Sequence, residues 1–302
     1  FTYKIYELDN GRLYTDSVSD TAIIKKKKIF KGPSFQFRAT NSAVINVSPE
    51  ENLAFLNGTP RLQKKIEGQV LSLLTGGAGK ENYWHWMFDV LPRLGIFEDV
   101  INLESIDFFL LPDNKKKFQL ETLEILKIPK SKQISSVEYR HILTKNLYTT
   151  SHPVVLNDNS TDSMLKIPGW ISKWLKEKFF NNNIKNKKTF SKKIYLDRSD
   201  SSSNVKNLRS VVNENEVKNY LKNEGFKFIK LADLNFNDQV LTFSGADIIV
   251  GLHGAGFANM PFCKPNTRIV EFKSNPFDDV IKNLAVTNDL MHISINCPSN
   301  KI

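Results

Sequence analysis

The sequence predicts an α/β protein with two domains and parallel sheets, and three observations support this class. From residue 193 onward, short apolar runs alternate with amphipathic segments, and the connections between them are short. A looser alternation of the same kind runs from residue 81 to residue 180. Between these regions, residues 181–192 are rich in Asn and Lys and nearly lack core residues, which is typical of a linker. We therefore expect an N-terminal α/β domain at 1–180, a linker at 181–192 and a C-terminal domain at 193–302.

The N-terminal region is expected to begin with strands and turns, because Gly and Pro punctuate its short β-like runs. After residue 75, helices and short strands are expected to alternate. The expected strands are Tyr3–Leu8, Ala43–Val47, Val70–Leu74, Asp107–Leu111, Gln133–Val137 and Asn146–Thr149, and the expected helices are Glu81–Phe97, Lys116–Leu126 and Met164–Phe180.

The C-terminal region alternates more regularly, which predicts a parallel sheet with helices on both faces. Its run Asp247–Leu252 is almost continuously apolar, as a buried parallel strand should be. Asn213 is expected to cap the first helix, with Glu216 completing a capping box. The expected strands are Lys193–Leu196, Phe226–Leu231, Asp247–Leu252, Thr267–Phe272 and Met291–Ile295, and the expected helices are Glu214–Asn223, Asp238–Ser244 and Asp278–Val286.

The composition argues against several classes of protein. With 302 residues, 40% hydrophobic and 25% charged, the chain has the length for two cores and the balance of a globular protein. No segment approaches the roughly 18–20 consecutive apolar residues of a membrane-spanning helix, and no secretion signal is recognised. The two cysteines, Cys263 and Cys297, suit neither a CxxC metal site nor a disulfide framework. We expect a cytoplasmic protein, with peripheral contact at the inner face of the membrane.

The net charge of +10 fits attraction to anionic partners such as nucleotide diphosphates, acidic glycans or lipid phosphates. A composition rich in Lys and Asn explains the same charge without any partner. The lysine clusters lack interleaved aromatic residues and match no nucleic-acid-binding module, so we expect no nucleic-acid partner.

A glycine-rich turn, His253-Gly254-Ala255-Gly256, follows the apolar strand of the C-terminal region. Ligands of open α/β sheets bind at the carboxyl ends of strands. Glycines let the main chain approach a phosphate, and the N–H groups at a helix start favour negative charge. We expect His253 at the mouth of this turn, able to donate to a phosphate oxygen. A tight turn with small residues for packing would explain the glycines without a ligand.

Three charged residues of the same region could complete a nucleotide site. Glu271 closes the strand after the turn, where a carboxylate can accept hydrogen bonds from ribose hydroxyls. Arg198 and Arg209 follow the strand Lys193–Leu196, and a guanidinium fork matches the oxygens of a leaving diphosphate. The alternative is a pair of solvated arginines, or an ion pair with Asp197 or Asp200.

A polar stripe lies on an otherwise apolar helix of the N-terminal region. Asn82, His85 and Asp89 are at positions i, i+3 and i+7, so they share one face. A carboxylate four residues from an imidazole can hydrogen-bond to it and raise its basicity, which suits a general base. The alternative is a satisfied His–Asp pair without a catalytic role, and no third metal ligand lies nearby in sequence. Pro92 marks the end of this helix or a kink.

Three blocks, taken in this order, resemble glycosyltransferase family 61. They are Asn82-x-x-His85-x-x-x-Asp89-x-Leu91-Pro92, then Arg198 and Arg209 leading to Asn213-Glu214-x-Glu216, then Gly251-x-His253-Gly254-Ala255-Gly256-x-x-Asn259-Met260 followed by Glu271. The resemblance implies a GT-B fold, in which two Rossmann-like domains with parallel sheets face each other across a cleft. It also implies inversion at the anomeric carbon, a UDP-sugar donor in the C-terminal domain, and neither a required metal nor another cofactor.

The resemblance also implies roles for individual residues. The donor-binding residues would be Asn82, His253, Gly254, Ala255, Gly256, Asn259 and Glu271, and the catalytic residues would be His85, Asp89, Arg198 and Arg209. Either His85 or Asp89 would accept the proton. We expect an enzyme that transfers a sugar from a nucleotide sugar to a glycan or lipid-linked glycan in bacterial surface polysaccharide synthesis. The alternatives are a sugar-nucleotide epimerase of similar architecture, which needs no acceptor, and an inactive nucleotide- or glycan-binding subunit.

Overall fold

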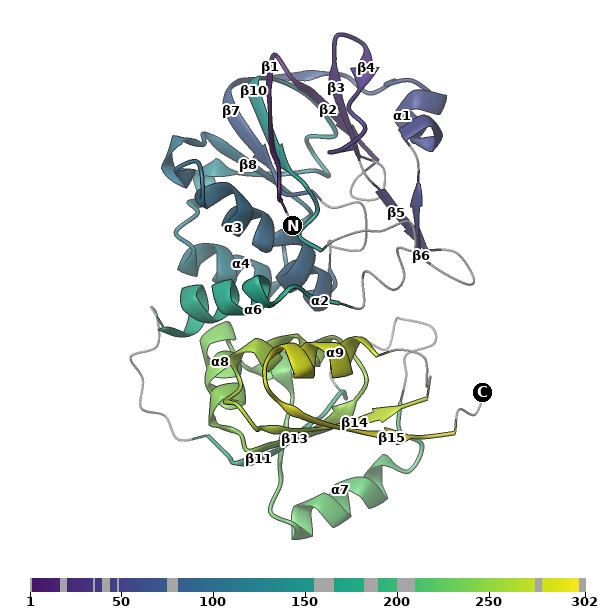
Figure 1. Ribbon diagram of the computed structural model, residues 1–302, viewed down its shortest axis with the longest axis vertical. Helices are drawn as coiled ribbons and strands as arrows, with labels where there is room; N and C mark the ends of the chain where they lie inside the picture. The colour runs from purple at the N-terminus through teal and green to yellow at the C-terminus, as the bar shows by residue number, and fades with distance from the viewer. Residues whose placement is uncertain are drawn as a thin grey trace. The chain divides into compact units, whose positions relative to one another are not determined.

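In the computed structural model, the chain divides into two compact units, Phe1–Met164 and Leu165–Ile302 (Figure 1). The second unit begins before the expected linker because helix α6 (Gly169–Lys176) packs with C-terminal elements. The Lys176 ammonium donates to the main-chain carbonyl of Cys263 at 3.3 Å, and the Phe179 ring meets Phe236 edge-on. The structure describes residues 2–16, 21–34, 36–39, 44–47, 49–74, 81–154, 166–181, 190–199, 210–274 and 279–298.

The N-terminal unit is built on an eight-stranded mixed sheet in the order β4-β3-β2-β10-β7-β8-β9, and β1 also pairs with β10. Its strands are β1 Ile5–Asp9, β2 Arg12–Thr15, β3 Thr21–Lys25, β4 Lys28–Ile29, β7 Lys64–Ser72, β8 Phe108–Leu111, β9 Gln133–Ser135 and β10 His141–Thr150, with β5 Gln36–Ala39 and β6 Val44–Val47 in a separate hairpin. Pairing is parallel only from β10 to β9. The parallel sheet expected for this domain is therefore present in part: β10, β7, β8 and β9 pair in parallel, whereas the short links joining β2, β3 and β4 make these strands antiparallel neighbours.

The tight turn between β1 and β2 requires glycine at position 11. A Cβ at Gly11 would lie 2.6 Å from Cβ of Leu147 and 2.9 Å from the Leu8 carbonyl oxygen. Asn10 takes the left-handed conformation at φ 49°, which Asn tolerates better than most residues. Because the turn is this tight, β1 and β2 both pair with β10 along one edge.

The helices of the N-terminal unit are α1 Leu53–Leu56, α2 Tyr83–His85, α3 Pro92–Glu98 and α4 Lys117–Ile125. Between α2 and α3, residues Trp86–Val90 form a π-helical turn, in which the Leu91 N–H donates to the Trp86 carbonyl at 3.0 Å. Pro92 has no N–H to donate and starts α3 directly after this turn, which confirms the expected break. Helix α3 packs on β10, where the Phe97 ring meets Tyr148 edge-on at 5.4 Å.

The C-terminal unit is a wholly parallel five-stranded sheet in the order β12-β11-β13-β14-β15. Helix α7 covers one face, and α8 and α9 lie on the other (Figure 1). Numbered along the chain, the strand order is 2-1-3-4-5, which is a doubly wound, Rossmann-like arrangement. The strands are β11 Lys193–Leu196, β12 Lys227–Ile229, β13 Ile248–Leu252, β14 Arg268–Lys273 and β15 Met291–Asn296, and the helices are α6 Gly169–Lys176, α7 Glu214–Asn223, α8 Phe236–Gly245 and α9 Val280–Thr287.

The expected capping box of α7 does not form. Asn213 occupies the cap position, but its side chain accepts no main-chain hydrogen bond. Its amide instead donates to the Glu216 carboxylate at 3.2 Å, so the two capping side chains bond to each other. Within the described residues, no helix combines the length and apolarity needed to cross a membrane.

Candidate functional site

The first cluster of candidate residues lies at the switch point of the C-terminal sheet. Strands β11 and β13 are parallel neighbours, and the chain leaves them toward different parts of the sheet. A crevice that opens outside the carboxyl ends of two such strands is the usual ligand site of a doubly wound sheet. Arg198 follows β11 and His253 follows β13, and Nη1 of Arg198 donates to the main-chain carbonyl of His253 at 2.8 Å. These two predicted residues are therefore brought together.

The glycine turn after β13 is shaped around Arg198. A Cβ on Gly254 would lie 2.9 Å from Nη1 and 3.2 Å from Cζ of Arg198, so glycine lets the guanidinium lie against the turn. The φ of Gly254 is 162°, which is extended main chain that any residue adopts, so close approach is what requires glycine. A Cβ on Gly256 would meet the Leu231 side chain at 3.1 Å, which indicates packing. The 3₁₀ helix η7 (Ala255–Phe262) begins within the turn.

Arg198 forms no ion pair with Asp197, and Asp200, the other partner that the sequence left open, lies outside the described residues. The Asp197 carboxylate instead bonds to the Lys218 ammonium at 3.0 Å and accepts from the Ser199 N–H at 2.9 Å. Burial by itself would raise the pKa of Asp197, but these two partners lower it below its ordinary value. The carboxylate therefore stays ionised without neutralising the guanidinium beside the turn.

Glu271 on β14 is buried between two histidines. Its side chain is 1% exposed, and its two oxygens accept from Nδ1 of His253 at 2.5 Å and from Nε2 of His292 at 2.8 Å. Burial alone would raise the pKa of Glu271, but the hydrogen bonds from His253 and His292 lower it. An ionised carboxylate in this position fixes the orientation and tautomer of the His253 ring.

The remaining donor-side predictions have different outcomes. Asn259 is fully buried, and its amide donates to Gln239 on α8 at 3.2 Å, which ties η7 to that helix. Ala255 is partly buried at the start of η7. Arg209 lies outside the described residues.

The second cluster lies on the N-terminal unit, where the π-helical turn carries His85 and Asp89. Nδ1 of His85 donates to Oδ2 of Asp89 at 2.5 Å, so the predicted pair is formed. The Asp89 side chain is 9% exposed, whereas the His85 side chain is 21% exposed. Nε2 of His85 has no hydrogen-bond partner among the described residues. The ring nitrogen that could accept a proton is therefore on the histidine, with the carboxylate behind it.

Two residues that were not predicted complete this cluster. The Arg93 guanidinium is buried, donating to the main-chain carbonyl of Asp89 at 3.1 Å and to that of Thr150 at 3.2 Å. His152 lies on the other side of the carboxylate, with Nε2 at 3.9 Å from Oδ1 of Asp89. Arg93 and His152 thus join the π-helical turn to the carboxyl end of β10.

The electrostatics of the cluster favour an ionised Asp89 and a basic His85. Burial by itself lowers the pKa of His85, but the Asp89 hydrogen bond and charge outweigh it and raise the pKa. Burial by itself raises the pKa of Asp89, but His85, His152 and Arg93 together lower it. Burial lowers the pKa of His152 to about 4, so this ring is neutral at pH 7.

Asn82 acts as the cap of the helix that bears His85. Its side-chain oxygen accepts from the Trp84 N–H at 2.9 Å. The glycine loop before it, at residues 76–79, lies outside the described residues. Among the described residues, no group of three or more His, Cys, Asp or Glu side chains is arranged to hold a metal ion.

His152 and His292 were missed because each is a single histidine without a motif. His152 could have been found from the rule that ligands bind at the carboxyl ends of parallel strands. His152 follows β10, whose carboxyl end lies beside that of the parallel strand β7. His292 lies within β15 and gives no such signal, because its partner Glu271 is on the neighbouring strand.

Comparison with known proteins covers both clusters. Residues 83–270 match the family described as Glycosyltransferase 61, a span that holds His85, Asp89, Arg198 and His253 and stops one residue before Glu271. No curated protein matches the chain. Since the match takes in more than half of the sequence, the chain belongs to glycosyltransferase family 61 and is a glycosyltransferase.

Proposed function

We propose that this enzyme is an inverting, metal-independent glycosyltransferase that moves a sugar from a UDP-sugar onto a hydroxyl of a glycan or lipid-linked glycan. The observation that carries the proposal is the contact between Arg198 and the His253 turn at the switch point of a doubly wound sheet. A guanidinium and main-chain N–H groups at this position suit a diphosphate better than an uncharged ligand.

On the donor side, we assign the diphosphate to Arg198, His253 and the turn 254–256. Because Nδ1 of His253 donates to Glu271, its Nε2 can donate to a phosphate oxygen only in the doubly protonated imidazolium form, which the neighbouring Glu271 carboxylate and a bound phosphate would both favour. We assign Glu271 to the support of His253 rather than to the ribose, since both of its oxygens already accept from histidines. Arg209 is proposed as a second cation for the leaving group.

On the acceptor side, we assign the general base to His85 and its orientation to Asp89. The exposed fractions and the hydrogen-bond direction support this choice over a carboxylate base. The arrangement matches the general pattern of an imidazole that is held in one tautomer by a buried carboxylate.

The proposed reaction is a single displacement. Nε2 of His85 takes the proton of the acceptor hydroxyl, and the oxygen attacks the anomeric carbon from the face opposite the diphosphate. The bond between the anomeric carbon and the diphosphate oxygen breaks, and the electron pair leaves with UDP. Positive groups that are already in place stabilise that charge without reorganisation, and they supply what a divalent cation supplies in other transferases.

The cellular context is proposed from the charge of the chain. The basic net charge suits a nucleotide-sugar donor and an anionic acceptor or membrane face. We propose surface polysaccharide synthesis in a bacterium, inside the cell and at the inner face of the membrane.

The test is an assay of nucleotide diphosphate release. Purified enzyme is incubated with UDP-sugars, with and without glycan acceptors, and UDP and the sugar products are quantified. The proposal expects UDP release that depends on an acceptor and a product with the inverted anomeric configuration. A product epimer formed without any acceptor would instead identify an epimerase, and no turnover of any nucleotide sugar would indicate a binding subunit.

A further inference from the structure

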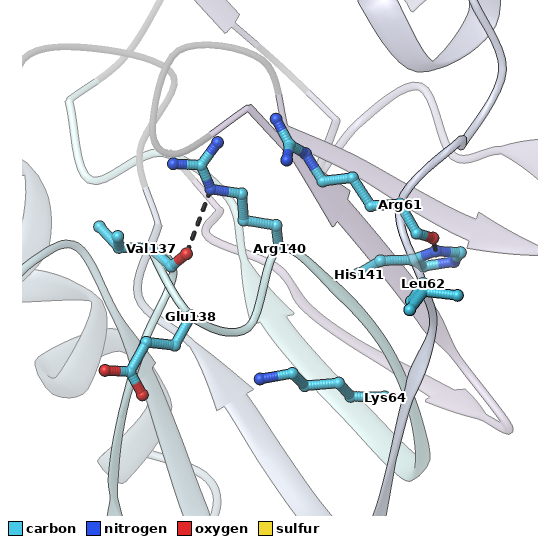
Figure 2. A pocket seen from close by; sticks show the side chains of 7 residues that line it. All are labelled: Arg61, Leu62, Lys64, Val137, Glu138, Arg140 and His141. Carbon is cyan, nitrogen blue, oxygen red and sulfur yellow. Dashed lines mark hydrogen bonds between the residues drawn. The ribbon is translucent and has the colours of Figure 1, made fainter.

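A basic pocket lies at the amino end of strand β10, the opposite end from the His85 cluster. It has a volume of about 350 Å³ and is lined by Arg61, Leu62, Lys64, Val137, Glu138, Arg140 and His141. Lys64 begins β7 and His141 begins β10, so the pocket is at the amino ends of these parallel strands. Figure 2 shows the guanidinium groups of Arg61 and Arg140 on one side of the pocket and the Lys64 ammonium entering from another.

The buried His141 side chain forms the floor of the pocket. Its Nδ1 donates to the main-chain carbonyl of Arg61 at 2.7 Å, which leaves Nε2 as the acceptor of the ring. Nε2 lies 3.2 Å from the Arg12 guanidinium and 3.1 Å from the Gln63 amide, both of which can donate. The ring therefore crosslinks segment 61–63 to β10 and keeps Arg61 in position.

The three cationic side chains of the pocket have no carboxylate partner among the described residues. Among the described residues, Arg61, Lys64 and Arg140 form no ion pair with a carboxylate. Glu138 is the acidic residue of the lining, and its carboxylate points away from the two guanidinium groups (Figure 2). Behind His141, Nε of Arg12 is buried and has no hydrogen-bond partner within the described part of the chain. Three cationic side chains thus line one hollow beside a single acidic one, Glu138, and none of the three forms an ion pair within the described residues.

The pocket cannot be part of the acceptor cluster. Arg93 and His152 join that cluster to the carboxyl end of β10, whereas His141 is at its amino end. A strand of ten residues spans roughly 30 Å. An ion bound here is therefore too far from Asp89 to take part in proton transfer.

We propose that this pocket binds a phosphate group, carried by a free phosphate or by the headgroup of an anionic lipid. Guanidinium groups and an ammonium provide the forked and point donors that phosphate oxygens accept. Leu62 is 92% exposed at the rim, which places an apolar side chain in water next to the cations. That combination fits a phosphate ester on an apolar body at a membrane surface. The proposal stands whether or not the transfer reaction is as described above.

The test is a calorimetric titration of inorganic phosphate into the full-length protein and its variants. Lys64→Ala and Lys65→Ala form a matched pair, because Lys65 is the next residue of the strand, 70% exposed and outside the pocket. Arg61→Ala is the third variant. The C-terminal unit is the same in all of them, so phosphate bound there contributes equally.

The second arm measures cosedimentation with vesicles of phosphatidylglycerol and with vesicles of phosphatidylcholine. Loss of one charge-assisted hydrogen bond should weaken binding about tenfold in Lys64→Ala and Arg61→Ala, and less than about twofold in Lys65→Ala. That pattern with inorganic phosphate supports a site for the free ion, and the same pattern only with phosphatidylglycerol supports a lipid headgroup. Equal losses in Lys64→Ala and Lys65→Ala, or no binding in either arm, would overturn the proposal.

Discussion

Nη1 of Arg198 lies 2.8 Å from the main-chain oxygen of His253, and the missing side chain of Gly254 makes room for the guanidinium. Two residues that are 55 positions apart in sequence are thereby joined at the carboxyl ends of adjacent parallel strands. Asp197, the residue before Arg198, pairs with the Lys218 ammonium at 3.0 Å. This contact is the centre of the proposed diphosphate site.

Substitution of Arg198 should impair turnover without unfolding the protein. Arg198→Ala removes a cation from the developing charge of the leaving group, and we expect kcat to fall by about 10²–10³-fold. UDP release under saturating donor measures this. Arg268→Ala, which removes an exposed arginine from the start of β14, is the matched control and should keep kcat within about twofold. A normal kcat in Arg198→Ala would remove this residue from the mechanism.

Gly254→Ala should act through Arg198. A new Cβ at 2.9 Å from Nη1 pushes the guanidinium aside, because the side chain is flexible and can yield. We expect kcat/KM for the UDP-sugar to drop about tenfold, since small displacements of positioning groups are costly. Gly169→Ala, whose Cβ would be at an ordinary 3.6 Å from Thr287, serves as the control and should leave kcat/KM unchanged. Equal kinetics in the two variants would argue against the turn as a binding element.

The pH dependence of activity should report His85. Asp89 raises the pKa of His85, so in the unaltered enzyme kcat/KM should fall as the pH drops through a value above the ordinary 6.5. In Asp89→Asn the charge is lost and burial remains, so the inflection should move to lower pH and kcat/KM should fall by about 10²–10⁴-fold. A pH–rate series for both proteins measures this, with Asp99→Asn as an exposed control. An inflection that stays in place in Asp89→Asn would assign it to another group.

Glu271 should contribute to stability in a defined pH range. Its pKa is lower in the folded protein than the ordinary 4.5, so its stabilisation is present above that pH and is lost as the pH falls through the folded value. Glu271→Gln should lower the free energy of unfolding at pH 7 by about 2 kcal/mol, because the amide leaves one histidine N–H without an acceptor. The variant should also lose less stability than the unaltered protein between pH 5 and pH 3. Urea unfolding at several pH values measures both, and parallel curves would show that Glu271 is not coupled to folding.

Much of the C-terminal unit could be predicted from the sequence, because each of its elements carries a local signal. The strand Ile248–Leu252 lacks polar side chains and the glycine turn follows it directly, so the position of His253 was predictable. The pairing of His85 with Asp89 followed from helical spacing alone. In both cases the residues that matter are close together in sequence, so local spacing was enough to predict them.

Other features depended on contacts that are distant in sequence. The carboxylate of Glu271 was expected to hold a ribose, and only the alignment of β13, β14 and β15 reveals that it bonds to two histidines. The strands β2 and β3 were not predicted, since they are short and gain their burial from pairing with β10 and with each other. A helix period also cannot reveal the π-helical turn at Trp86–Val90, which ends just before Pro92.

Calorimetric titration with UDP and with uridine is the most direct test of the diphosphate site. The two ligands share the nucleoside and differ in the charged group that Arg198 and His253 are proposed to hold. We predict that UDP binds at least about 100-fold more tightly than uridine, and that Arg198→Ala removes about tenfold or more of this difference while Arg268→Ala preserves it. Equal affinities for UDP and uridine, or an undiminished difference in Arg198→Ala, would contradict the account.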